Sequence, residues 1–345
     1  MRHRERGFVE VPRKDPGYRP VEERRRDFKA VEQMLSDGDL REQTARCMDC
    51  GIPFCQSADS AMGCPVFNRI PEFNDQVYHG QWQEALDLLL EGSCFPEFTG
   101  RICPAPCEAS CVCGINRDPV SIRQIEVTII ENAYKRGFMQ PRLPSRRLGK
   151  RVAIIGSGPA GLAAAHRLNQ AGATVVVFER DRYAGGMLRY GIPDFKLEKW
   201  IVERRIDLMR QEGICFELGV EVGRDISFHY LAPRFDAILL AGGAREARDL
   251  TIEGRALDGV EFAMDFLSRQ NMLNGGEDTR GCKSISATGK HVVVVGGGDT
   301  GSDCVGTSIR QGAVSVTQFE ILPRPPDQRP LSTPWPEWPN KMRTS

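Results

Sequence analysis

Residues 151–179, with the sequence RVAIIGSGPAGLAAAHRLNQAGATVVVFE, constrain the fold of this chain more than any other stretch. An apolar run enters Gly156-x-Gly158-x-x-Gly161, an alanine-rich helical pattern follows, and a second β-branched run ends on Glu179. In such a unit the glycines permit a tight turn, let a pyrophosphate approach a helix N-terminus, and let helix and strand pack closely. An acid about 20 residues later can accept a hydrogen bond from a ribose hydroxyl. The stretch therefore predicts a Rossmann-like, dinucleotide-binding α/β domain.

The chain repeats this pattern near its C-terminal end. The run HVVVV enters Gly296-x-Gly298-x-x-Gly301, and after a helical stretch a second strand ends on Glu320. Two nucleotide sites in one chain predict a relay, with a flavin in the first and a nicotinamide nucleotide in the second. Glu320 favours NADH because its charge repels a 2′-phosphate, whereas the nearby Arg324 favours NADPH. The sequence leaves this choice open.

Further candidate cofactor contacts lie beside the glycines. Residues 184–193, AGGMLRYGIP, contain glycines that let the backbone lie against a flat ligand, and 236–243, DAILLAGG, predict another parallel strand that ends in glycines. The candidates added for the flavin are Pro159, Ala160, Arg180, Gly186, Met187 and Leu188, and those added for the nicotinamide nucleotide are Asp299 and Thr300.

Nine of the twelve cysteines fall between Cys47 and Cys113. A first run, Cys47-x2-Cys50-x4-Cys55, is followed by Cys64 before a proline, as in ferredoxin-type runs. The second run contains Cys103, Cys107, Cys111 and Cys113, and a helical pattern over about residues 81–90 separates the two. Two such runs predict a pair of 4Fe–4S clusters. Zinc is the alternative, but zinc sites usually show two C-x2-C pairs, and only one pair here has that spacing.

A helix predicted after Pro119 places Glu126 within or beside an apolar stripe. The stripe consists of Ile122, Ile125, Ile129 and Ala133. An inward carboxylate needs a partner. That partner is either an arginine such as Arg123, which is the commoner outcome for a buried carboxylate, or an iron atom, and the spacing alone favours the arginine.

Lysine plus arginine balance aspartate plus glutamate at 46 each, so no global field favours nucleic acid or an anionic membrane. No apolar run approaches the roughly 18 residues of a membrane span, and the charged start lacks an apolar signal region. We therefore expect a cytoplasmic protein. The expected parts are a charged arm over 1–35 with a helix over 21–35, a helical iron–sulfur domain over 36–140, an FAD-binding domain over 150–288, and an inserted, incomplete NAD(P)H-binding domain over 289–345.

Five stretches together make the chain resemble the small (beta) subunits of glutamate synthase over essentially all 345 residues. They are RCMDCGIPFC, TGRICPAPCEASC, AIIGSGPAGLAAA, GGMLRYGIP and VVVGGGDTGSD. The resemblance extends to the N-terminal half of dihydropyrimidine dehydrogenase and to small subunits of NADH-dependent ferredoxin oxidoreductases. It implies electron flow from NADPH or NADH through FAD and two 4Fe–4S clusters to a large (alpha) subunit that contains FMN. That subunit would form L-glutamate from glutamine and 2-oxoglutarate.

The resemblance also implies a ligand set. Cys47, Cys50, Cys55 and Cys111 would hold one cluster, and Cys64, Cys103 and Cys107 the other. A residue on the following helix completes the second cluster in this family; the match is Glu126, with Cys113 as competitor, and Cys94 and Cys113 are otherwise ordinary buried thiols. Family members continue beyond this length to complete the nucleotide domain. Two alternatives are a related ferredoxin-linked or electron-bifurcating subunit and a truncated, non-catalytic docking subunit that binds zinc.

Overall fold

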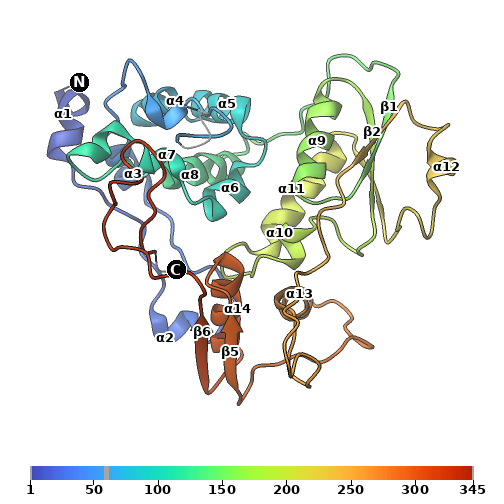
Figure 1. The fold of residues 1–345 in the computed structure, drawn as a ribbon. Helices are drawn as coiled ribbons and strands as arrows, with labels where there is room; N and C mark the ends of the chain where they lie inside the picture. Colours follow the sequence, from blue (N-terminus) through green and yellow to red (C-terminus); the bar gives the residue numbers. More distant parts are fainter. Residues whose placement is uncertain (1, 58–61, 344–345) are drawn as a thin grey trace. The chain divides into compact units, whose positions relative to one another are not determined.

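A computed structural model describes residues 2–57 and 62–343, and the chain divides into two compact units (Figure 1). The first unit comprises Met1–Arg19, Val31–Gln140 and Leu322–Ser345, and the second comprises Pro20–Ala30 and Pro141–Ile321. Among the described residues, no helix is both long enough and apolar enough to cross a membrane.

The first unit is built of helices connected by cysteine-bearing loops. Its central helix, α8 (Ile122–Lys135), packs against α5 and α6, and each residue of the expected apolar stripe is at most 1% exposed. The remaining helices are α1 (Arg2–Glu10), α3 (Asp37–Thr44), α4 (Ile70–His79), α5 (Trp82–Gly92), α6 (Pro96–Ile102) and α7 (Pro106–Ala109), with 3₁₀ turns at Phe54–Gln56 and Val112–Ile115. The helical N-terminal domain predicted from the sequence is thereby confirmed.

Two N-terminal helices differ in how they are stabilised. Ser36 caps α3, because its Oγ accepts a hydrogen bond from the backbone N–H of Asp39 at 3.1 Å. The helix expected over 21–35 is wrong in length, since α2 covers only Val21–Arg24. None of the residues of α2 is buried, so no apolar face stabilises a longer helix there.

A four-stranded parallel sheet forms the main layer of the second unit, with the strand order β3-β2-β1-β4. The order reverses between β1 and β4, and ligands of open α/β sheets bind at the carboxyl ends of strands at such a reversal. The strands are β1 (Arg151–Ile155), β2 (Thr174–Glu179), β3 (Cys215–Leu218) and β4 (Ala237–Leu240), and the helices are α9 (Pro159–Gln170), α10 (Met187–Tyr190), α11 (Lys199–Gln211) and α12 (Phe228–Leu231). This topology confirms the predicted Rossmann-like domain.

The repeated glycine motif forms a second, smaller layer in the same unit. Strands β5 (His291–Val295) and β6 (Ser315–Phe319) pair in parallel, and helices α13 (Ala263–Asn274) and α14 (Asp299–Arg310) pack with them (Figure 1). Their shared core consists of Phe266, Leu267, Ala287, Val294 and Cys304. In the described part of the chain this sheet has two strands.

The C-terminal residues contact the helical unit. The sequence assigned them to the nucleotide domain, but residues 322–343 group with the cysteine-bearing helices. The Ser110 hydroxyl donates to the carbonyl oxygen of Pro336 at 2.8 Å, and the Arg329 guanidinium donates to the carbonyl oxygen of Ala109 at 3.2 Å. A proline-rich segment has few backbone donors for a strand ladder, so single hydrogen bonds and ring contacts fix it instead.

Candidate cofactor sites

The first glycine loop leaves open space at one position only. A Cβ at Gly156, where φ is +106°, would lie 2.4 Å from the carbonyl oxygen of Ala241, and a Cβ at Gly161 would lie 2.0 Å from that of Gly156. A Cβ at Gly158 would meet nothing within 4 Å. This free space adjoins the N-terminus of α9, which begins with Pro159 and Ala160 and where a pyrophosphate is expected to bind.

The acid at the end of β2 binds the same loop. Glu179 is 4% exposed, and its Oε2 accepts hydrogen bonds from the Ser157 backbone N–H at 2.8 Å and the Ser157 hydroxyl at 2.6 Å. Its Oε1 accepts a bond from the backbone N–H of Asp181 at 2.9 Å. Glu179 thus fixes the conformation of the glycine loop. Sequence reasoning missed Ser157, because it occupies a variable position of the motif.

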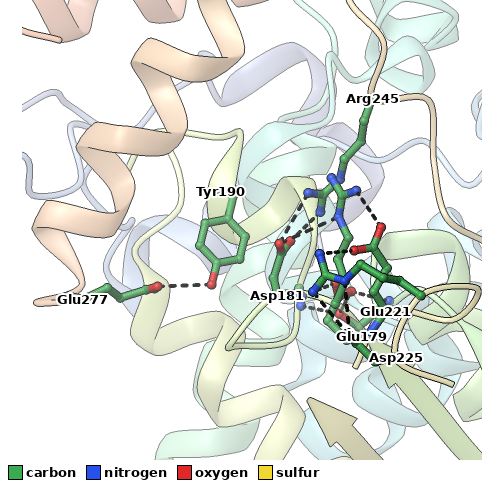
Figure 2. Close-up of polar contacts among 11 residues, drawn as sticks. Glu179, Asp181, Tyr190, Glu221, Asp225, Arg245 and Glu277 are labelled. Carbon is green, nitrogen blue, oxygen red and sulfur yellow. Dashed lines mark hydrogen bonds and ion pairs between the residues drawn. The ribbon is translucent and has the colours of Figure 1, made fainter. Parts of the chain in front are cut away.

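Figure 2 shows the polar groups around this end of the sheet. Arg245, which follows β4, forms an ion pair with Asp181, and the Tyr190 hydroxyl donates to Oε2 of Glu277 at 3.2 Å. Arg180, a candidate contact, lies 3.9 Å from a Glu221 carboxylate oxygen. Sequence reasoning missed Arg245, since its pairing brings together residues that are 64 positions apart.

The segment after β2 approaches the glycine loop closely. Gly186 has a φ of +50°, and a Cβ there would lie 2.8 Å from the Cα of Gly158. Of the two neighbouring candidates, Leu188 is buried whereas Met187 is 50% exposed. The structure therefore brings Gly158 and Gly186 together, and Met187 has a surface open to a ligand.

The second glycine loop repeats the geometry of the first. A Cβ at Gly301 would lie 2.2 Å from the carbonyl oxygen of Gly296, and a Cβ at Gly298 would meet nothing within 4 Å. Glu320 Oε2 accepts a hydrogen bond from the backbone N–H of Gly297 at 2.7 Å. Asp299 and Thr300 open helix α14 at this loop. Arg324, in the C-terminal segment, forms an exposed ion pair with Asp327 at 2.8 Å.

Four of the candidate cysteine ligands line one cavity in the helical unit. They are Cys47, Cys50, Cys55 and Cys111, and Phe54, Asn74 and Cys113 also line the cavity. Burial raises the pKa of the Cys47 thiol to about 11, and the neighbouring Cys111 and Cys50 raise it further. Burial also raises the pKa of Cys55, which has the same neighbours. Metal binding converts such thiols to thiolates with release of protons.

A second group contains Cys64, Cys103, Cys107 and Glu126. Burial is the main cause that raises the pKa of each of these three thiols, and the nearby Glu126 carboxylate raises it further. Among the described residues, no three His, Cys, Asp or Glu side chains converge on the position of a single metal ion. In the first group the thiols surround a cavity, which suits ligands that bind separate irons of one cluster.

Glu126 is 6% exposed and its partner is an amide. Asn68 Nδ2 donates to its Oε1 at 2.8 Å, whereas Arg123 pairs with Glu32 at 2.6 Å. Burial raises the pKa of Glu126 to about 7. The interpretation of Arg123 as its ion-pair partner is therefore not realised, and sequence reasoning had no signal for Asn68, which lies 58 positions away.

The competing ligand, Cys113, lies with the first group. It lines the cavity together with Cys50 and Cys111, and its Sγ lies 3.4 Å from the carbonyl oxygen of Asp118. Cys113 is buried as expected, whereas Cys94 is only half-buried. Glu126, unlike Cys113, therefore lies near the thiols of the second group.

Two groups of thiols, together with two glycine loops at the ends of parallel strands, define an iron–sulfur flavoprotein oxidoreductase that uses a pyridine nucleotide. Residues 24–138 match the family model described as dihydropyrimidine dehydrogenase domain II, 4Fe-4S cluster, and residues 150–341 match the pyridine nucleotide-disulphide oxidoreductase family. These matches agree with the expected cofactors, which are 4Fe–4S clusters, FAD and NAD(P)H.

Named relatives of high sequence identity identify the family to which the chain belongs within this class. The glutamate synthase [NADPH] small chain of Mycobacterium tuberculosis (strain CDC 1551 / Oshkosh) is 54% identical over 98% of this chain and 69% of the relative. That of Bacillus subtilis (strain 168) is 52% identical over 97% of this chain and 69% of the relative. The glutamate synthase [NADH] of Schizosaccharomyces pombe (strain 972 / ATCC 24843) is 50% identical over 98% of this chain and 16% of that protein. The chain belongs to the glutamate synthase small-chain family.

Proposed function

We propose that this chain is the electron-input subunit of a glutamate synthase. It would pass electrons from NAD(P)H by way of FAD and two 4Fe–4S clusters to a large subunit that makes L-glutamate from glutamine and 2-oxoglutarate. A bound flavin supplies the chemistry that this path needs, because it accepts a hydride and releases electrons singly.

The observation that carries the proposal is the grouping of the cysteines in a chain of this family. Cys47, Cys50, Cys55 and Cys111 line one cavity, so we assign them to one cluster. The buried carboxylate of Glu126 lies close enough to raise the pKa of three other thiols, those of Cys64, Cys103 and Cys107. We therefore assign these four residues to the other cluster.

The chain's own residues have binding and positioning roles in this scheme. The open space at Gly158 would receive the FAD pyrophosphate. Glu179 holds the loop and would offer its carboxylate to the ribose. Gly298 and Glu320 would do the same for the nicotinamide nucleotide. The α9 and α14 N-termini each direct backbone N–H groups toward phosphate.

Anaerobic purification of the full chain tests the proposal. We expect a brown protein with about eight iron atoms and one flavin per chain, which reduces ferricyanide with NAD(P)H. Addition of a glutamate synthase large subunit, glutamine and 2-oxoglutarate should yield glutamate. Ferredoxin reduction without any glutamate formation would favour the ferredoxin-linked alternative. A colourless protein that contains zinc would favour the docking alternative.

A further inference from the structure

The C-terminal segment 329–337 is bonded to residues that adjoin the proposed cluster ligands. Arg329 donates to the carbonyl oxygen of Ala109, and Ser110, which precedes Cys111, donates to the carbonyl oxygen of Pro336. Ser110 is fully buried, and its hydroxyl oxygen also accepts a hydrogen bond from the backbone N–H of Gly63 at 3.0 Å. These contacts fix the segment beside the loops that carry the thiols.

The segment places one aromatic residue, Trp335, against Phe54, a residue that lines the first cavity. The ring centroid of Trp335 lies 4.9 Å from that of Phe54, with an interplanar angle of 54°. Phe54 precedes Cys55 and lines the cavity together with Cys47, Cys50 and Cys111. Cys55 follows Phe54, and Cys111 follows Ser110, which is bonded to Pro336. Both of these proposed ligands belong to the first group.

The indole N–H of Trp335 is buried and has no hydrogen-bond partner in the described part of the protein. An indole N–H is a donor only, and buried tryptophan N–H groups usually find an acceptor. Trp338, three residues later, is arranged differently, because its ring lies under the Arg343 guanidinium at 3.7 Å. Trp335 is thus a buried donor that lacks an acceptor next to a cavity lined by thiols.

We propose that the Trp335 indole N–H donates a hydrogen bond to a sulfur of the cluster held by Cys47, Cys50, Cys55 and Cys111, and that segment 329–337 positions it there. The inference rests on the cluster assignment proposed above. Hydrogen bonds to cluster sulfurs are one of the factors that set the reduction potential. A donor stabilises the more negative, reduced state, so Trp335 raises the potential of this cluster. Trp335 is a positioning and tuning residue that makes reduction of this centre easier.

The substitution Trp335→Phe tests this role, because it keeps a ring against Phe54 and removes only the N–H. Potentiometric EPR titration of the full reconstituted chain should show a lower midpoint potential for one cluster, with iron content unchanged. Perturbation of the EPR signal in Cys50→Ser identifies that cluster. The matched control, Trp338→Phe, should leave both potentials unchanged.

A second measurement does not depend on any variant's folding. The chain has four tryptophans, so indole-¹⁵N labelling followed by pulse EPR of the reduced protein should show one nitrogen coupled to the first cluster. Absence of that coupling, an unchanged potential in Trp335→Phe at full iron content, or a shift confined to the cluster that Cys50→Ser spares would overturn the inference. Wild-type protein without iron would instead refute the cluster assignment itself.

Discussion

Three glycines of one motif have different physical roles at the residue scale. Gly156 and Gly161 are required by the polypeptide itself, because a Cβ at either position would overlap a carbonyl oxygen. Gly158 faces open space, so its lack of a side chain serves the ligand rather than the fold.

We therefore expect Gly158→Val to remove the flavin while the fold and the iron content remain. The matched variant Gly161→Val should lower both flavin content and stability, since its Cβ would lie 2.0 Å from the Gly156 carbonyl oxygen. Flavin absorbance, iron analysis and thermal unfolding of the two proteins make the comparison. Equal loss of stability in both variants would contradict this separation of roles.

Substitutions of Glu126 and of Cys113 should differ in their effect on the iron content. Glu126→Ala should reduce the iron content by about half, because we propose Glu126 as the fourth ligand of one cluster of a pair. Cys113→Ser should leave the iron content unchanged, although Cys113 lies in the cavity of the first group. Iron and sulfide analysis after anaerobic reconstitution measures both. The reverse pattern would make Cys113 the ligand.

Lys199 gives the protein a pH dependence with a defined sign. Burial lowers the pKa of its amine from 10.5 to about 8, and its Nζ donates to the carbonyl oxygens of Ile192 and Leu197. Below pH 8 the folded and unfolded states both hold the proton, so the cost of the buried charge is constant. Between pH 8 and 10.5 only the unfolded state holds it, so the folded state gains stability as the pH rises.

Relative to Lys199→Met, the wild-type protein should therefore gain about 3 kcal/mol of unfolding free energy over this pH range. Urea unfolding of the two proteins at several pH values measures the difference. A constant difference across the range would mean that Lys199 titrates normally.

At the scale of elements, the second glycine loop resembles the first but uses its acid differently. Glu320 accepts a hydrogen bond from the Gly297 N–H, and it stands at the place in the motif where an acid is expected to contact the nucleotide ribose. Removal of that charge by Glu320→Gln should raise the preference for NADPH over NADH. The expected change in the ratio of kcat/KM values is about tenfold, or ~1.4 kcal/mol. Dye reduction with each nucleotide measures it, and an unchanged ratio would show that Glu320 does not read the ribose.

Elements with local patterns were predictable from the sequence, and those that depend on distant partners were not. The first βαβ unit and α8 follow from glycine spacing and helical periodicity over a few residues. The short length of α2 does not follow, because its charged pattern permits a helix that no tertiary contact stabilises. The Asn68 partner of Glu126 and the docking of residues 329–337 join positions far apart in the chain, for which a single sequence has no signal.

At the scale of the whole molecule, the candidate cofactor-binding residues fall into two structural units. The helical unit contains the thiols and the carboxylate that we propose as cluster ligands, and the α/β unit contains the two glycine loops that we propose as nucleotide sites. The C-terminal segment, which follows β6 in the chain, packs within the helical unit. The chain spans 69% of its bacterial relative from Mycobacterium tuberculosis, and both groups of proposed ligands lie in that span.

The central claim is that this one chain holds two 4Fe–4S clusters together with a flavin. The most direct measurement combines iron, sulfide and flavin analysis of the anaerobic protein with quantitative EPR after reduction by dithionite. We predict about eight irons, about eight sulfides, one FAD and EPR signals that integrate to about two spins per chain. Bound zinc in place of iron, or signals that integrate to a single cluster, would contradict the account.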